Sequence, residues 1–249
     1  MSKKKNVNIV VISIAGSAGK STFSRHGLAP LIPNSVRISI EDWNSGDGKS
    51  ALEIGAKAFY SLAAQINIDD EQSFIIDIGT SNSKQMVQHF SDLELTREKI
   101  DFWVIPVRAG SKERIDTLKT ISLLKEMGVD PKTIIVIGQA VSDIAQFDAD
   151  FFSLIEAAEN FGFIFAKQAV LFNDVFNLIK GGDASVFDIV HNNPDFKELK
   201  KQHIGDDQGL IDIGNQMLIY SLAKTASKNL LSVFNSTPIP AALEHGWGE

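Results

Sequence analysis

Five short apolar runs, each followed by a segment with helical spacing, constrain the fold of this chain more than any other sequence feature. The runs span residues 7–14, 35–40, 73–79, 101–107 and 133–139. Most are apolar at successive positions, which is typical of strands in a parallel sheet that is covered on both faces. Strand and helix alternating in this way predict an α/β fold with right-handed crossover connections.

Helical spacing follows the first four runs and then dominates the last third of the chain. The segments that alternate with the runs span residues 22–32, 50–66, 83–93 and 111–128. The last of them has an apolar stripe and ends at Gly128, a residue that commonly stops a helix. The stripe consists of Ile115, Leu118, Ile121, Leu123 and Leu124. Beyond about residue 165, helices are predicted at 171–180, 184–191, 194–203 and 208–234.

The chain is therefore expected to form one domain with a helical appendix. Residues 1–165 would be the α/β core, and residues 166–235 a helical C-terminal part packed on it. Residues 236–249, which contain two prolines and two glycines, would be a flexible tail. With 249 residues, of which 44% are hydrophobic, one sizeable core can be buried.

The sequence IAGSAGKST, from Ile14 to Thr22, lies where the first run gives way to the first helical segment. The general phosphate-binding loop has Gly, four residues, and then Gly-Lys-Ser or Gly-Lys-Thr. Here Ile14 stands where that pattern has its first glycine, and the glycines are Gly16 and Gly19. Such a loop binds phosphates through successive backbone N–H groups and the end of a helix dipole. The predicted nucleotide contacts are Gly16, Ser17, Ala18, Gly19, Lys20, Ser21 and Thr22.

A second Gly-Lys-Ser, at residues 48–50, follows the second run. It comes after Glu41, Asp42 and Asp47, and carboxylates beside a bound triphosphate would repel it. We expect a loop there, with Lys49 at the mouth of a helix, and assign the nucleotide to the first stretch.

Carboxylates that could serve a bound metal follow two other runs. Asp77 ends the apolar run SFIID, as in a Walker B motif, where the acid reaches Mg²⁺ directly or through water. Glu41 and Asp42 follow the second run, and loops at the carboxyl ends of parallel strands line the ligand crevice. We therefore predict Lys20, Glu41 and Asp42 as catalytic residues, and Ser21, Asp77 and Glu41 as metal ligands. A solvated loop at 41–42 is the alternative.

These motifs together resemble a known family. The shifted loop, the acids after the second run and the Asp77 motif look like the ParA/MinD class of deviant-Walker P-loop ATPases, which implies a three-layer P-loop fold with a mostly parallel central sheet. A narrower resemblance, over roughly residues 7–143, is to StbB-type plasmid stability proteins. It rests on GSAGKSTFSRHGLAPLIP, VRISIEDWNSGDG, IIDIGTSN and FWVIPV, and above all on Arg25-His26 with Leu28-Ala29-Pro30.

The resemblance implies a protein that binds ATP with Mg²⁺, hydrolyses it slowly and forms a homodimer face to face around the nucleotide. It would act in plasmid inheritance or positioning, with a DNA-bound plasmid partner protein and non-specific DNA as partners. Lys20 would hold the phosphates, Ser21 and Thr22 would serve the metal and the α-phosphate, Glu41 would position water, and Asp77 would complete the metal shell.

Two departures from the ParA class qualify these expectations. The class carries a signature lysine just before its first glycine, and this chain has Ala15 there. Hydrolysis would then be weak, or Lys49, Arg25 or Arg108 would supply the cation. The class often reads adenine with an Asn at the end of its fifth strand, where this chain has Gln139. Two other functions stay open, a nucleotide-locked binding module with little turnover and a P-loop small-molecule kinase.

Two groups of basic residues also have simpler structural interpretations, and the composition excludes some classes of function. The alternative for Arg25 and His26 is the exposed side of the first helix, ahead of Pro30. The lysines at 197, 200, 201, 224 and 228 allow DNA contact but also suit a solvated face. A net charge of −7 argues against a broadly basic surface, and the absence of cysteine excludes disulfides and thiolate chemistry. No apolar stretch is long enough to span a bilayer, so we expect a cytoplasmic protein.

Overall fold

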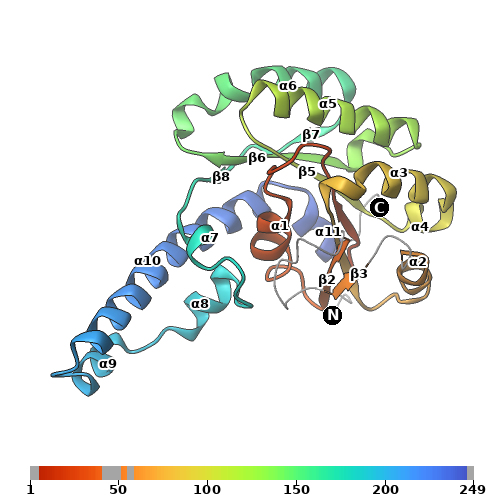
Figure 1. Ribbon diagram of the computed structural model, residues 1–249. Coiled ribbons are helices and arrows are strands. Elements are labelled where there is room, and N and C mark those ends of the chain that lie inside the picture. Colours follow the sequence, from red (N-terminus) through yellow and green to blue (C-terminus); the bar gives the residue numbers. More distant parts are fainter. Residues whose placement is uncertain (1–5, 41–51, 55–58, 246–249) are drawn as a thin grey trace.

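A parallel sheet of eight strands forms the centre of the computed structural model, which describes residues 6–40, 52–54 and 59–245 (Figure 1). The described strands are β1 (Ile9–Val11), β2 (Ser35–Ile40), β3 (Leu52–Ile54), β4 (Ser73–Ile78), β5 (Phe102–Val107), β6 (Ile134–Val141), β7 (Ile164–Phe165) and β8 (Val170–Leu171). Their order is β3-β2-β4-β1-β5-β6-β7, and β8 pairs with the end of β6. Every described pair is parallel, so the carboxyl ends of the strands share one edge.

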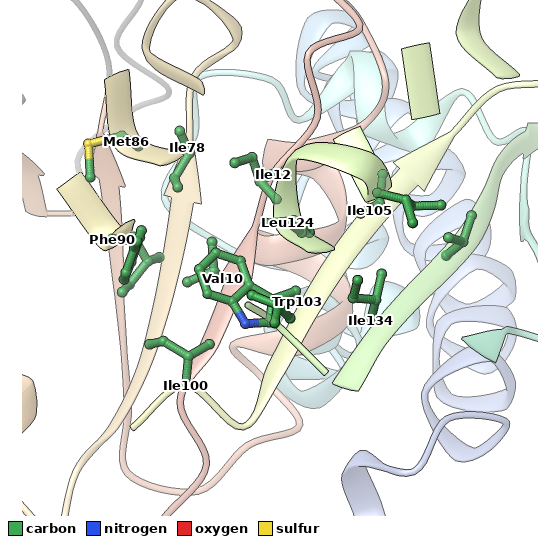
Figure 2. Packing of buried hydrophobic residues seen from close by; sticks show 14 of the residues in the cluster. Val10, Ile12, Ile78, Met86, Phe90, Ile100, Trp103, Ile105, Leu124 and Ile134 are labelled. Carbon is green, nitrogen blue, oxygen red and sulfur yellow. The ribbon is translucent and has the colours of Figure 1, made fainter. Parts of the chain in front are cut away.

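Side chains of each central strand alternate between two apolar layers, because successive residues of a strand point to opposite faces. In β1, Val10 belongs to one buried cluster and Ile9 and Val11 to the other. Figure 2 shows the first cluster, in which the Trp103 ring lies beside Val10, and its centroid is 5.0 Å from that of Phe90. Both faces of the sheet are thus covered, and the predicted three-layer α/β architecture is confirmed.

Different helices supply the two outer layers. The first cluster is covered by α2 (Phe59–Ile68), α3 (Ser83–Asp92), α5 (Ser111–Glu126) and α6 (Phe147–Phe161). A short helix, α4 (Glu94–Glu98), follows α3. The second cluster is covered by α1 (Lys20–Phe23), α7 (Val175–Leu178), α8 (Val186–Asn192), α10 (Asp207–Asn235) and α11 (Ile239–His245). The remaining helix, α9 (Phe196–Gln202), has no buried residue.

The structure corrects three of the predicted segments. The helix expected over 171–180 is reduced to α7, Val175–Leu178, which follows strand β8. The helix expected over 50–66 is instead strand β3 followed by α2, which continues to Ile68. In α5, Ile121 and Leu124 are buried as expected, but Ile115 is 54% exposed. Helix α6 was not predicted, although its apolar residues have helical spacing.

The expected flexible tail is also wrong for most of its length. Helix α11 forms there, and Ile239, Ala242 and Leu243 are buried in the second cluster. Its two prolines, Pro238 and Pro240, precede the helix or lie in its first turn, where a missing N–H costs little. They begin this helix instead of preventing it. Residues 246–249 lie outside the described part.

Helix α10 carries the C-terminal part away from the sheet. It has 29 residues, about 44 Å at 1.5 Å per residue. All but one of its buried residues lie between Ala223 and Phe234, where it crosses the second cluster. Its first half extends past the sheet together with α8 and α9 (Figure 1). No described helix has the length and apolarity required to cross a membrane.

Candidate functional site

A cavity of about 420 Å³ opens at the carboxyl edge of the sheet, where five strands end. The loop after β1 forms its floor, and further walls come from the ends of β4, β5, β6 and β8 and from α7. The residues that line it are Ser17, Ala18, Gly19, Lys20, Ser21, Thr22, Arg25, His26, Gly79, Thr80, Arg108, Gln139, Ala140, Val170, Leu171, Phe172, Asn173, Phe176, Asn177 and Lys180. Six of the seven predicted nucleotide contacts in the loop are therefore brought together with Gln139.

The loop between β1 and α1 has the backbone conformation of an anion-binding nest. Ser17 and Gly19 both have positive φ angles, of 53° and 87°. Gly19 is required there for a second reason, because a Cβ would lie 3.0 Å from the Gln139 side-chain oxygen. Alternation of positive and negative φ angles turns successive N–H groups toward a common point. Helix α1 begins at the next residue, Lys20.

The Lys20 side chain is held across the loop in a closed set of hydrogen bonds. Its ammonium donates to Thr80 Oγ1 at 2.7 Å and lies 3.5 Å from the carbonyl oxygens of Ser13 and Ala15. The Thr80 hydroxyl in turn lies 3.2 Å from the Ala15 carbonyl oxygen. A buried ammonium requires such acceptors. Thr80, from the end of β4, thus fixes the lysine beside the loop.

The charge of the cavity wall is positive. Lys20, Arg25, Arg108 and Lys180 line it, and no Asp or Glu does so among the described residues. Arg25 and His26 are 5% and 4% exposed, on a π-helical turn (Ser24–Leu28) that continues α1. The alternative that placed them on the exposed side of the helix is therefore wrong. Short π-helical segments are frequent at functional sites.

His26 is buried as a neutral imidazole. Its ring packs against Phe176 with centroids 5.5 Å apart, and its Nδ1 has no hydrogen-bond partner among the described residues. Burial lowers the pKa of His26 from 6.5 to about 3, and the charges of Arg25 and Arg37 act in the same direction, against Asp188.

This depressed pKa predicts a stability loss in acid. Above pH 6.5 the imidazole is neutral in both states; between pH 6.5 and about 3 it is protonated only in the unfolded chain. Stability therefore falls with falling pH by about 1.4 kcal/mol per unit. Between about pH 6.5 and pH 5, the free energy of unfolding measured in urea should fall by about 2 kcal/mol more for the wild type than for His26→Leu. His191→Gln, at an exposed position, should behave as the wild type; equal losses in all three would contradict the prediction.

Asp77, near the end of β4, forms a buried ion pair with Arg37 that the sequence analysis did not anticipate. Its Oδ2 accepts from Arg37 Nη2 at 2.7 Å and from the Ser24 hydroxyl at 2.9 Å. The Ser24 hydroxyl also accepts from Arg37 Nε at 2.8 Å and lies 3.2 Å from the Ser21 carbonyl oxygen. The three side chains thus connect β2, β4 and α1.

The second carboxylate oxygen of Asp77 is the one left for a cation. Oδ1 is buried and has no hydrogen-bond partner among the described residues. Asp77 does not line the cavity, which is bordered instead by Gly79 and Thr80. The described residues contain no cluster of three or more His, Cys, Asp or Glu able to hold a metal. Its role as a metal ligand stays a proposal, and so do those of Glu41 and Asp42, which lie outside the described residues with Lys49.

Gln139 and Ala15 occupy the positions at which the chain departs from the ParA pattern. Gln139 lies near the end of β6, is 4% exposed, lines the cavity and has an Nε2 with no partner among the described residues. Such a buried donor suits a ligand acceptor. Ala15 is 4% exposed and its carbonyl faces Lys20, so this position offers the cavity no cation. Of the proposed substitutes, Arg25 and Arg108 both line the cavity.

The wall formed by β8 and α7 was missed by sequence reasoning. Phe172, Asn173, Phe176, Asn177 and Lys180 come from a segment assigned only as helical. No motif marks them, because long-range packing brings them to the cavity. Arg37, in contrast, left a signal: it is the one charged residue in a run whose other members are Ser, Val and Ile.

The fold and the loop geometry define a three-layer α/β protein with a phosphate-binding type of loop after its first strand. No protein-family model and no curated protein sequence matches the chain. Among solved structures, the MinD cell division protein of Aquifex aeolicus matches with a TM-score of 0.55 at 12% identity, covering 92% of this chain and 95% of that one. A chain of the MinC:MinD cell division protein complex of A. aeolicus matches with a TM-score of 0.54 at 13% identity, covering 92% of this chain and 94% of that one. The chain therefore has the fold of MinD.

Proposed function

We propose that this protein is a Mg-ATP-binding P-loop ATPase of the ParA/MinD superclass, similar to StbB-type plasmid stability proteins. It would act in plasmid inheritance or positioning through nucleotide-dependent dimerisation. One observation carries the proposal: the cavity combines a backbone nest, the start of α1 and four cationic side chains, without a described carboxylate on its wall. That combination fits a polyphosphate better than any neutral or cationic ligand.

In this proposal each part of the cavity has a chemical task. The loop N–H groups and Lys20 bind the β- and γ-phosphates, and Thr80 keeps the Lys20 ammonium in place. Ser21 would coordinate Mg²⁺ and Thr22 would contact the α-phosphate, with Asp77 Oδ1 and Glu41 completing the metal shell. Mg²⁺, when bound, would neutralise charge on the phosphate oxygens. Glu41 or Asp42 would orient the attacking water, and Gln139 would read the base.

Slow turnover is part of the proposal. Ala15 provides no cation to stabilise charge that develops in the transition state, and Arg25 and Arg108 would partly replace it. The same observation favours a second candidate, a nucleotide-locked binding module that hydrolyses almost nothing.

Calorimetric titration with ATP and GTP, each with and without Mg²⁺, tests the binding step. We expect saturable ATP binding that Mg²⁺ strengthens; no binding of either nucleotide would overturn the proposal. Phosphate release with and without DNA separates the ATPase from the locked module. Light scattering should show an increase in mass on addition of Mg·ATP, and phosphorylation of an added metabolite would instead indicate a kinase.

A further inference from the structure

Helix α10 presents an exposed stripe along its outer side, from Asp207 to Lys228. The stripe follows alternating four- and three-residue steps, the spacing of a helix–helix seam. Its members are Asp207, Ile211, Gly214, Leu218, Ser221, Thr225 and Lys228, and all seven are exposed. Its two large apolar members, Ile211 and Leu218, are 57% and 53% exposed.

This stripe is not the side that packs on the protein. The residues of α10 buried against the body, Ala223, Ala226, Leu230 and Val233, lie on another side of the helix. Helices α8 and α9 also contact α10, and the ring of Tyr220 in α10 lies 5.5 Å, between centroids, from that of Phe196 in α9. The stripe therefore stays open while α10 extends beyond the sheet (Figure 1).

The order of residues in the stripe is self-complementary about Leu218. If a second α10 runs antiparallel with Leu218 opposite Leu218, Gly214 lies opposite Ser221, and Ile211 opposite Thr225. Small residues at the inner positions let the two backbones approach closely. The outermost layer then places Asp207 opposite Lys228, and the two-fold symmetry makes this pair twice. Within the described part of the chain, neither Asp207 nor Lys228 has an ion-pair partner.

The same register explains a further exposed residue. Ile204, in the turn before α10, is 81% exposed. Antiparallel pairing brings it to the level of Leu231, which is 42% exposed and lines a shallow groove of about 440 Å³. The rest of this groove is polar, formed by Lys228, Ser232, Asn235 and Ser236. Ile204 of one copy and Leu231 of the other thus lie at matching distances from the two-fold axis.

We propose that α10 is a self-association surface, on which α10 of a second copy of this chain packs antiparallel with Leu218 at the two-fold axis. The surface is separate from the nucleotide cavity and works without nucleotide. It does not depend on the ATPase proposal above.

The absence of cysteine from the chain permits a direct test. Leu218→Cys places one thiol per chain at the axis, and mild oxidation without nucleotide should give a disulfide-linked dimer. Gln216→Cys, exposed on another side of the same helix, is the matched control and should cross-link poorly. Equal cross-linking of the two variants, or none by Leu218→Cys, would overturn the proposal.

Charge exchange tests the register in the otherwise native protein. Sedimentation equilibrium should show association weakened on the order of tenfold by Asp207→Lys or by Lys228→Asp, because each places like charges together. The double variant should regain it, since its charges are opposite again across the interface. Circular dichroism controls for folding. A wild type that stays monomeric at high micromolar concentration would refute self-association, even if it bound DNA or another protein through α10. The Lys20→Ala variant should still associate.

Discussion

Replacement of Arg37 by methionine is expected to lower the free energy of unfolding by about 3–5 kcal/mol. Arg37 and Asp77 are 3% and 1% exposed at the side chain, and their closest atoms are 2.7 Å apart. Without the guanidinium, the Asp77 carboxylate keeps only the Ser24 hydroxyl as a described donor. A buried charge that loses its counter-ion is among the most destabilising changes a single substitution can make.

Urea denaturation of three variants measures this effect. Arg97→Met removes a cation from the Arg97–Glu94 pair, in which Glu94 is 72% exposed, and should cost less than about 1 kcal/mol. Arg37→Met with Asp77→Leu removes both charges and should recover most of the loss, because buried pairs are often replaceable by apolar residues. A single Arg37→Met variant as stable as Arg97→Met would contradict the expectation.

The ion pair also bears on the proposed metal site. It engages one carboxylate oxygen of Asp77 and leaves Oδ1, while Ser24 connects the pair to the backbone of Ser21. Arg37 therefore orients the carboxylate that the sequence assigns to the metal. It also halves the number of oxygens that Asp77 can offer.

The five central strands were predictable from the sequence because burial on both faces of a sheet imposes an apolar pattern, whereas the short strands β3, β7 and β8 were not predicted. The runs that became β5 and β6 are apolar at nearly every position, whereas those that became β2 and β4 also contain serines and one charged residue each; all four boundaries are met within about two residues. The loop at Gly16–Thr22 was predictable for a similar reason. Gly19 combines a positive φ with a close approach to Gln139, and a residue without a side chain meets both requirements.

The elements that were missed depend on contacts distant in sequence. Helix α11 begins at prolines that also suit a mobile tail, and only its packing in the second cluster distinguishes the two. Phe172 and Phe176 reach the cavity because α10 positions β8 and α7, through bonds such as that from Leu171 N–H to Asn229 Oδ1 at 2.9 Å. No local pattern records such a contact.

The arginine at 37 is an intermediate case. A charge inside an apolar run predicts either an error in the strand assignment or a buried partner. Its register opposite Ile75, two residues from Asp77, makes the second outcome possible. Sequence alone does not show which carboxylate lies near enough.

Substitution of Lys20 by alanine is expected to weaken ATP binding about 10- to 100-fold and to abolish phosphate release. The ammonium would contribute charged hydrogen bonds to the phosphates, each worth about 1.5–3 kcal/mol. The fold should persist, because the Thr80 hydroxyl still lies 3.2 Å from the Ala15 carbonyl oxygen when the lysine is absent. Calorimetric titration with Mg·ATP measures the loss, and thermal unfolding checks the fold.

Lys49→Ala is the matched control, because it removes the lysine of the other Gly-Lys-Ser in the chain. It should bind ATP as the wild type does, since that stretch follows three carboxylates in sequence, whereas Lys20 lies in a cavity lined by cations. A loss confined to Lys49→Ala would move the phosphates to residues 48–50 and leave the basic cavity without its proposed ligand. A loss in both variants would mean that Lys49 supplies the cation missing at Ala15, and phosphate release would then fall further than affinity in Lys49→Ala.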